Sequence, residues 1–237
     1  MSELNGKTIL LTGANRGIGR ALAERLLRAD ATLIATVRSA QAAAKLADEL
    51  GASGGRLSVE QCDIAIESDV ASLRARVEAK YPHIDVLINN AGMFLKADRS
   101  MNADDLDLRV LQQTLDVNLF GTISMCKAFA PLIAPCGRIV NVSSTMGQLD
   151  DGGLPSYAVG YSVSKTALNA YTSSLANALA PRSIMVDALH PGWVKTDMGG
   201  AGAQISPAAG TETIYFLATR PAGVTGKFWF EKQIIPW

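Results

Sequence analysis

The sequence predicts an α/β fold in which helices cover both faces of a doubly wound parallel β-sheet of about seven strands. Short apolar runs alternate with helical patterns along the whole 237-residue chain. Near the N-terminus, an apolar run, a glycine-rich stretch, a helical pattern and a second apolar run fit within about 30 residues, the size of one βαβ unit. Several runs are continuously apolar, which is typical of strands buried on both faces.

The predicted elements follow one another in a regular order. Strands are expected at 8–11, 33–37, 57–62, 84–88, 138–142, 184–189 and around Phe228. Helices are expected at 18–27, 40–50, 68–80, 103–133 with an interruption near Asn118, 160–180 and 207–218. Right-handed crossovers between such strands give a doubly wound sheet. Because no linker, repeat or charge block divides the chain, we expect one domain over residues 1–237.

The composition excludes several classes of protein. The chain has 22 Lys and Arg residues against 22 Asp and Glu residues, whereas a nucleic-acid binder normally carries a basic excess. A hydrophobic content of 48% excludes a disordered chain. Residues 1–7 lack the pattern of a signal peptide, and no apolar run approaches 18 residues, so we expect a cytoplasmic protein without membrane contact.

The cysteines and histidines indicate neither disulfides nor a metal site. Cys62, Cys126 and Cys136 show no Cys-x-x-Cys spacing and are expected to be free thiols, buried or half-buried, in a reducing compartment. His83 and His190 stand far apart in the sequence, so a zinc site is not expected.

A glycine-rich stretch, Gly13-Ala14-Asn15-Arg16-Gly17-Ile18-Gly19, lies between the first strand and the first helix. Glycines allow a tight turn and a close approach of the backbone to a pyrophosphate. The start of the following helix offers free N–H groups to an anion. A plain strand-to-helix turn also uses glycine, so the strand–loop–helix context carries the prediction of a dinucleotide site.

The residues after the second strand favour NADP(H) over NAD(H). Arg38 follows this strand directly, and there is no acidic residue between Asp30 and Asp48 to bind a free ribose hydroxyl. Arg16 in the glycine loop is a second cation near the same place. We expect both guanidinium groups to be free of a nearby carboxylate and to hold the extra phosphate. The alternative is that both are solvated surface arginines.

Tyr161 and Lys165 open the predicted helix at 160–180, and their spacing of four residues puts them on one helical face. A tyrosine has an ordinary pKa near 10, and a neighbouring ammonium group favours the phenolate. We therefore expect the pKa of Tyr161 to be lowered, so that it can give or take a substrate proton. Taken alone, this spacing is common and has little meaning.

Taken together, the motifs resemble those of the classical short-chain dehydrogenases/reductases, which have a Rossmann-type fold. The matching residues occur in the family's order over nearly the whole chain: 12–19, Asp63, Asn89-Asn90-Ala91-Gly92, Asn118, Ser144, Tyr161 with Lys165, and Pro191-Gly192. Residues 190–200 and 234–237 are most similar to the carbonyl-reductase-like branch of this family.

The resemblance implies four catalytic residues. Tyr161 would be the general acid in carbonyl reduction, and Ser144 would hydrogen-bond the substrate oxygen, because Gly147 follows Ser144 at the family's spacing. Lys165 would bind the nicotinamide ribose and adjust the pKa of Tyr161. Asn118 would hold a water molecule that links Lys165 to solvent. The alternative is a polar residue that only interrupts a helix, and the family pattern outweighs this alternative.

The resemblance also implies a set of cofactor-binding residues. Asp63 would accept a hydrogen bond from the adenine amine, with backbone contacts from Ile64, and could also cap a helix. Thr196 would reach the nicotinamide amide or the pyrophosphate. The expected cofactor-binding residues are Gly13, Asn15, Arg16, Gly17, Ile18, Gly19, Arg38, Asp63, Ile64, Asn90, Ala91, Gly92, Tyr161, Lys165, Pro191, Gly192, Val194 and Thr196.

One spacing departs from the family pattern. Ser144 and Tyr161 are 17 residues apart, longer than usual, and the extra residues fall in 148–156. Tyr157 stands at a more usual distance from Ser144, but the residue four positions after it is Tyr161 and not a lysine. We therefore assign the catalytic role to Tyr161 and expect Tyr157 in the pocket wall.

These residues predict a reductase that uses NADPH to reduce a ketone or aldehyde without a metal. We expect the substrate loops at about 92–102, 146–158 and 193–210. Side chains beside the motifs are mostly bulky and apolar, which favours a hydrophobic substrate, although each could simply pack a loop. The candidate pocket residues are Phe94, Met146, Leu149, Leu154, Tyr157, Trp193 and Met198.

Several alternatives stay open. The chain could be an NAD(P)-linked alcohol dehydrogenase working in the oxidative direction, or a catalytically silent NADP-binding regulatory protein. An epimerase or dehydratase acting on nucleotide sugars generally has a sizeable extra C-terminal region, and this chain ends soon after its last predicted strand. Small and apolar residues on more than one face of the helix at 160–180 favour a homodimer or homotetramer slightly.

Overall fold

The eight strands of the computed structural model lie in one sheet, with the order β3-β2-β1-β4-β5-β6-β7-β8. The structure describes residues 3–51, 54–149 and 152–237. All neighbouring strands are parallel except β7 and β8, which are antiparallel. The strands are β1 (Thr8–Thr12), β2 (Thr32–Val37), β3 (Leu57–Gln61), β4 (Ile84–Asn89), β5 (Ile133–Val142), β6 (Met185–Leu189), β7 (Phe228–Phe230) and β8 (Gln233–Ile235).

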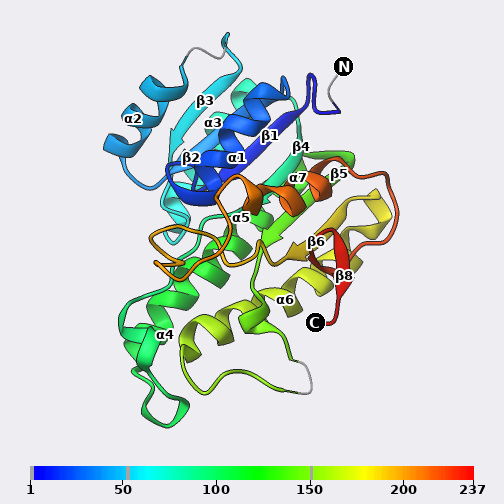
Figure 1. Cartoon of the computed structure of the whole chain (residues 1–237). Helices are drawn as coiled ribbons and strands as arrows, with labels where there is room; N and C mark the ends of the chain where they lie inside the picture. The colour runs from blue at the N-terminus through cyan, green and yellow to red at the C-terminus, as the bar shows by residue number, and fades with distance from the viewer. Residues whose placement is uncertain (1–2, 52–53, 150–151) are drawn as a thin grey trace.

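Helices cover both faces of this sheet, which confirms the predicted fold class (Figure 1). The helices are α1 (Gly17–Arg28), α2 (Ala40–Leu50), α3 (Glu67–Lys80), α4 (Leu108–Leu115), α5 (Thr122–Phe129), α6 (Val159–Leu179) and α7 (Glu212–Thr219). One apolar core joins the sheet to α1, α2 and α7 through residues such as Leu22, Leu46 and Leu217. A second core joins the other face to α3, α5 and α6, with Leu73 and Phe129 fully buried.

The long helix predicted at 103–133 is divided in the structure. Helices α4 and α5 are joined by a π-helical segment, η3 (Asp116–Gly121), which contains the interruption expected near Asn118. The predicted helix is wrong beyond Phe129, because the chain makes a 3-10 turn, η4 (Ala130–Leu132), which contains a proline at its start. Strand β5 then begins at Ile133, opposite Ile84, five residues earlier than predicted.

The edge strand β8 was not predicted, since about seven strands were expected and the last of them lay around Phe228. Strand β8 has only three residues, which is too short for an apolar alternation to be recognised. It follows β7 through a tight turn in which Glu231 and Lys232 both have positive φ.

The order of the strands creates the place for a ligand site. From β1 the chain moves outward through β2 and β3, and it then returns to place β4, β5 and β6 on the other side of β1. The order therefore reverses between β1 and β4. In open α/β sheets ligands bind at such a switch point, beyond the carboxyl ends of the strands. The glycine stretch, Asn90, Ser144 and Pro191 all follow strands at this edge.

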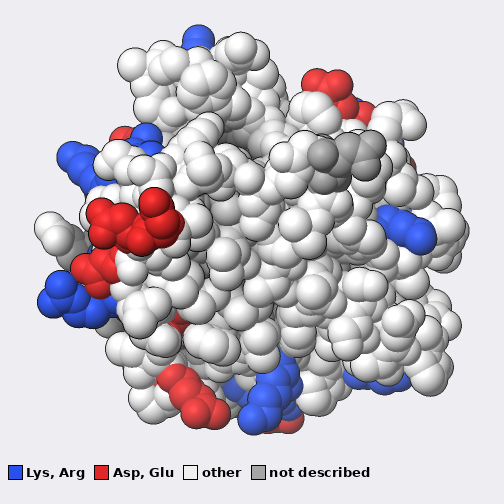
Figure 2. All heavy atoms as spheres, turned by 90° about the horizontal axis from the view of Figure 1, so that it is seen from below, with Lys and Arg blue, Asp and Glu red and all other residues white. Residues whose placement is uncertain are grey.

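The cysteines agree only partly with the expectation of buried or half-buried free thiols. Cys62 and Cys126 are buried free thiols, whereas Cys136 is exposed. Seen from below, from the side of α4 and α6, much of the surface carries no charged group (Figure 2). Within the described parts of the chain, no helix is both long and apolar enough to cross a membrane, and no cluster of three or more potential metal ligands occurs.

Candidate active site

A cavity of about 760 Å³ opens at the switch point and extends from the end of β2 to the start of α6. It brings together most of the residues singled out in the sequence. Those that line it are Gly13, Asn15, Arg16, Gly17, Ile18, Gly19, Arg38, Asp63, Ile64, Asn90, Ala91, Gly92, Tyr161, Lys165, Pro191, Thr196 and Met198. Asn118, Ser144, Gly192 and Val194 are not among the lining residues, although the first two contact residues that are.

The glycine loop is shaped by close backbone contacts. Gly13 and Gly17 have φ angles of +69° and +55°, which favour glycine. A Cβ atom at Gly19 would lie 2.0 Å from the carbonyl oxygen of Gly13. The N-cap residue of α1 is Arg16, and its side chain makes no capping hydrogen bond to the helix. The first N–H groups of α1 are therefore available to an anion.

The loop is tied to the segment after β4. The Thr12 hydroxyl accepts hydrogen bonds from the backbone N–H groups of Asn90 and Ala91, each at 3.0 Å. The Asn90 side chain donates to the carbonyl oxygens of Thr12 and Gly13 at 2.9 and 3.1 Å. These bonds hold two walls of the cavity together. Thr12 was not singled out as a separate site residue in the sequence.

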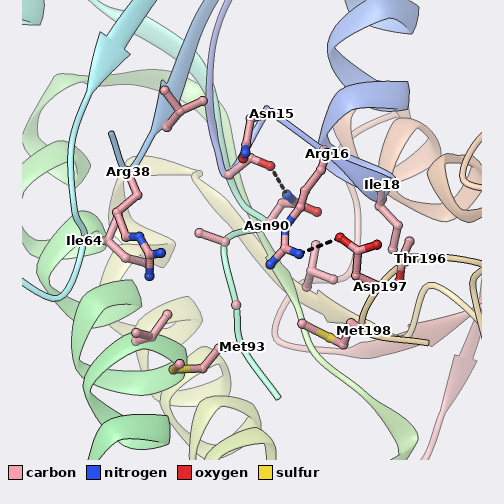
Figure 3. A pocket seen from close by; sticks show the side chains of 18 of the residues that line it. Asn15, Arg16, Ile18, Arg38, Ile64, Asn90, Met93, Thr196, Asp197 and Met198 are labelled. Carbon is pink, nitrogen blue, oxygen red and sulfur yellow. Dashed lines mark hydrogen bonds and ion pairs between the residues drawn. The ribbon is translucent and has the colours of Figure 1, made fainter. Parts of the chain in front are cut away.

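The expectation of two guanidinium groups without a nearby carboxylate is wrong for Arg16. Its side chain forms an ion pair of 2.7 Å with Asp197, which lies in the predicted substrate loop at 193–210 (Figure 3). Spacing along the chain could not show this pair, because 181 residues separate the partners. Arg38 is exposed on the cavity wall, apart from that pair, and forms no ion pair within the described parts of the chain.

Asp63 follows β3 and lines the same end of the cavity. Its side chain accepts a hydrogen bond of 3.1 Å from the N–H of Ala65, and its own N–H donates to the Asp69 carboxylate at 3.1 Å. One carboxylate oxygen therefore stabilises the turn that leads to α3. Ile64 is buried beside it, in contact with the position of Gly121.

The catalytic residues proposed from the sequence meet at the start of α6. Tyr161 is buried, and a hydrogen bond joins its side chain to that of Ser144. Ser143 is oriented differently, since its hydroxyl donates to the Asn169 side chain at 2.6 Å. The Ser144 hydroxyl also accepts a bond of 3.1 Å from the N–H of Met146.

The pKa of Tyr161 moves in the opposite direction from the sequence-based expectation. Burial raises this pKa to about 12, and the hydrogen bond with Ser144 opposes the rise only in part. Burial also lowers the pKa of Lys165 to about 8. The Lys165 ammonium lies 5.6 Å from the centre of the Tyr161 ring and donates to the carbonyl oxygen of Val142 at 2.8 Å. For both groups, removal from water therefore changes the pKa more than the neighbouring group does.

Asn118 lies in the π-helical segment, a feature often found at functional sites. Its side-chain oxygen accepts from the N–H of Met93 at 2.8 Å, and its side-chain nitrogen donates to the Met93 carbonyl at 2.9 Å and to the Ser164 hydroxyl at 3.0 Å. A Cβ atom at Gly92 would lie 3.4 Å from the Asn118 side-chain oxygen and 3.8 Å from the Lys165 nitrogen. The amide therefore fixes the chain beside Lys165, and its side chain has three protein partners.

The candidate substrate residues do not all converge. Phe94 stacks on Tyr161, with ring centres 4.6 Å apart, and Met198 lines the cavity. Leu149, Tyr157 and Trp193 are exposed. Met146 and Leu154 are half-buried but do not line the cavity. Residues 150–151 of the predicted loop at 146–158, like residues 1–2 of the segment 1–7, lie outside the described residues.

Sequence reasoning missed Asp98, which is fully buried and bonds to the backbone at the start of α6. It also missed Arg99, which stacks on Phe94 at 4.8 Å and donates to the carbonyl oxygen of Met198. One signal for Asp98 was available. The residue before α6 is Ala158, which cannot cap a helix, so a cap had to come from elsewhere.

Comparison with known proteins identifies relatives that are dehydrogenases and reductases. A family model described as short chain dehydrogenase matches residues 7–204. The chain is 33% identical over 230 residues to the 3-oxoacyl-(acyl-carrier-protein) reductase FabG of Salmonella typhimurium, covering 94% of this chain and 86% of the relative. It is 30% identical to carbonyl reductase (NADPH) 1 of Mus musculus, covering 96% of this chain and 97% of the relative.

A solved structure gives the same picture. The NADPH-bound carbonyl reductase from chicken fatty liver superposes with a TM-score of 0.87 and 28% sequence identity, covering 99% of this chain and all of the other. The likeness therefore extends over nearly the whole chain.

Proposed function

The chain belongs to the short chain dehydrogenase family of oxidoreductases, and from this premise we propose that it reduces a ketone or aldehyde to an alcohol with NADPH. The observation that carries the proposal is the cluster of Tyr161, Ser144 and Lys165 at one end of a cavity whose other end is the glycine loop. This arrangement supports the proposal of a proton donor and an anion-binding loop in one space.

The residues present fit a dinucleotide. A Cβ atom at Gly13 would lie 2.9 Å from the Cα atom of Ala91, and one at Gly17 would lie 2.9 Å from the Thr196 side chain. Glycine at these two positions therefore lets the backbone of the loop lie close to Ala91 and Thr196 without a clash. The uncapped start of α1 suits a pyrophosphate, and the exposed Arg38 suits the additional phosphate of NADP. A reduced nicotinamide, when bound, supplies the hydride for the carbonyl carbon.

The chain's own residues then handle the oxygen of the substrate. Ser144 donates a hydrogen bond to this oxygen, where negative charge develops as the carbonyl is reduced. Tyr161 delivers the proton to the same oxygen. A pKa of about 12 keeps its phenol protonated at neutral pH, which is the form that carbonyl reduction requires. Lys165 holds the ribose side of the site and assists proton return to Tyr161.

A hydrophobic carbonyl compound is the proposed substrate class. Support comes from Phe94 on the ring of Tyr161 and from Met198 on the cavity wall. The exposed Tyr157 and Trp193, on the loops at 146–158 and 193–210, add apolar surface that a larger substrate can cover. Substrates with charged arms gain no comparable partner from these four side chains.

The test is NADPH oxidation with a panel of lipophilic ketones and aldehydes and of charged sugars. Replacing Tyr161 by Phe removes only the hydroxyl, so we expect kcat to fall by about 10²-fold to 10⁴-fold, the usual worth of a general acid. NADPH binding, followed by its fluorescence, should stay unchanged. Tyr81→Phe, at the end of α3 and away from the cavity, is the matched control and should reduce lipophilic ketones at nearly the wild-type rate. Equal rates for wild type and Tyr161→Phe would remove Tyr161 from the mechanism.

A further inference from the structure

We infer that Asp98 is a positioning residue for the reaction, because its buried carboxylate fixes the backbone of Tyr161 from a loop more than 60 residues away. Its two oxygens accept hydrogen bonds from the N–H groups of Gly160 and Tyr161 at 2.9 and 2.7 Å. The inference rests on the proposed role of Tyr161 in carbonyl reduction and names the group that holds this side chain in place.

The start of α6 needs such a partner. The residue at the N-cap position, Ala158, has a left-handed backbone and no side-chain oxygen, so it leaves the first N–H groups without a local acceptor. The N–H groups that an N-cap side chain would normally satisfy are those of the second and third helical residues, which here are Gly160 and Tyr161. Asp98 supplies both bonds from η1 (Ala97–Ser100).

The contact is close and specific. Asp98 has no exposed surface, and no ion pair within the described parts of the chain includes it, so the N–H groups and the positive end of the helix dipole balance its charge. A Cβ atom at position 160 would lie 3.2 Å from both carboxylate oxygens. Glycine at this position therefore allows the carboxylate to reach two consecutive N–H groups at once.

The segment that carries Asp98 is itself fixed. At its beginning, the N–H and carbonyl groups of Met93 both bond to the Asn118 side chain. At its end, the N–H of Ala103 donates to the carbonyl oxygen of Ser156 at 3.2 Å, and Asn102 forms a β-bridge with Tyr157. Asp98 thus lies between two anchored ends of this segment. Its hydrogen bonds to Gly160 and Tyr161 therefore fix the start of α6 relative to the segment.

Further contacts hold the ring and the carbonyl group of Tyr161. Phe94, from the same segment, stacks on the Tyr161 ring. The Ser164 hydroxyl accepts from Asn118 at 3.0 Å and donates to the carbonyl oxygen of Tyr161 at 2.7 Å. The N–H, the carbonyl group and the ring of Tyr161 are therefore all held by residues connected to Asn118 and to the segment 93–98. Of these contacts, only the Asp98 carboxylate bonds to the N–H.

The test replaces Asp98 by Asn, which has nearly the same shape but can accept only one of the two N–H bonds and directs an NH₂ group at the other. A misplacement of about 1 Å can cost about 10²-fold in rate, so we expect kcat to fall by about 10-fold to 10²-fold. The KM for NADPH should change by less than about threefold, because the glycine loop is not altered. Asp98→Ala should show a larger loss of kcat if it folds.

The matched control is Asp107→Asn. Asp107 also caps a helix with its carboxylate, since it accepts from the N–H of Arg109 at 2.8 Å at the start of α4. Its variant should lose a similar cap and some thermal stability but keep the wild-type kcat. A purely structural role for Asp98 would give the same pattern, with a lower melting temperature and an unchanged kcat, and would overturn the inference.

A second measurement does not depend on turnover. The chain has five tyrosines, so it can be labelled with 3-fluorotyrosine and the ¹⁹F resonance of residue 161 identified with Tyr161→Phe. We expect Asp98→Asn to move this resonance and Asp107→Asn to leave it in place. If the wild type reduces no carbonyl compound, the proposed function fails, whereas the resonance still decides whether Asp98 positions Tyr161. An unmoved resonance would overturn the inference, as would a moved resonance with an unchanged kcat in an active wild type.

Discussion

The two ends of the cavity are built in different ways. At the catalytic end, Asn118 and Asp98 have no exposed surface and hold their partners through hydrogen bonds. At the phosphate end, the ion pair between Arg16 and Asp197 joins side chains that are 64% and 78% exposed. Arg38 is exposed as well. Buried hydrogen bonds hold the catalytic end in one arrangement, whereas the exposed side chains of the phosphate end can exchange their ion-pair partners.

The difference follows from the cost of removing charge and polarity from water. A buried polar group without its partner is costly, so the contacts around Tyr161 are retained or lost together. An exposed ion pair contributes only about 0.2–1 kcal/mol, so a cofactor phosphate can displace Asp197 from Arg16 at little cost. A fixed end suits proton transfer, and an exchangeable end suits a cofactor that enters and leaves on each cycle.

The largest effect should come from breaking the catalytic end at Asn118. Asn118→Ala leaves the N–H and carbonyl groups of Met93 without their side-chain partner. It also removes the bond that the Ser164 hydroxyl accepts, while the bond from this hydroxyl to the Tyr161 carbonyl oxygen remains. At about 1–3 kcal/mol for each polar group left without a partner, we expect a loss of at least about 2 kcal/mol in the free energy of unfolding, measured in urea. The kcat should fall with it. Asn102→Ala, at an exposed position, is the control and should stay within about 0.5 kcal/mol of wild type.

Retention of wild-type stability and kcat by Asn118→Ala would contradict the contrast drawn between the two ends. The cavity would then keep its shape through backbone packing alone.

The same contrast explains what could be predicted from the sequence. The phosphate end depends on local order along the chain: a strand, a glycine loop and a helix place residues 13–19, and Arg38 follows the next strand directly. Such placements can be derived from periodicity and topology. The four residues proposed to be catalytic came from the family resemblance, which supplies positions but not the contacts behind them.

What could not be predicted depends on partners distant in the sequence. Asp98 bonds to N–H groups 62 and 63 residues away, and Asp197 pairs with a residue 181 positions away. Spacing carries no signal for such contacts. The direction of the Tyr161 pKa was wrong for a related reason, since the spacing showed a nearby ammonium group but not the burial that outweighs it.

A smaller effect should come from altering the phosphate end at Arg38. Arg38→Asp replaces an exposed cation on the cavity wall by a carboxylate, which repels a phosphate and can accept from ribose hydroxyls. Hydrogen bonds to charged groups contribute about 1.5–3 kcal/mol, so the KM for NADPH should rise by about 10-fold to 10²-fold, while the KM for NADH stays equal or falls. Initial rates with both cofactors measure this.

The control for Arg38→Asp is Lys45→Asp, which makes the same change of charge on α2 at a side chain that is 77% exposed and does not line the cavity. It should leave the preference between NADPH and NADH unaltered. An unchanged preference for NADPH in Arg38→Asp would refute the role assigned to Arg38.

The smallest effect should come from removing the competitor of the cofactor phosphate. Asp197→Asn abolishes the ion pair with Arg16, so the guanidinium group no longer has to leave a carboxylate before it binds a phosphate. From the worth of an exposed pair, we expect NADPH to bind about twofold to fivefold more tightly at low salt, with kcat unchanged. The gain should shrink as salt screens both interactions. Fluorescence titration across a salt series measures it, with Asp104→Asn, at another exposed carboxylate, as the control. Weaker binding by Asp197→Asn would mean that the ion pair holds Arg16 ready for the phosphate, and the phosphate end would then be preorganised like the catalytic end.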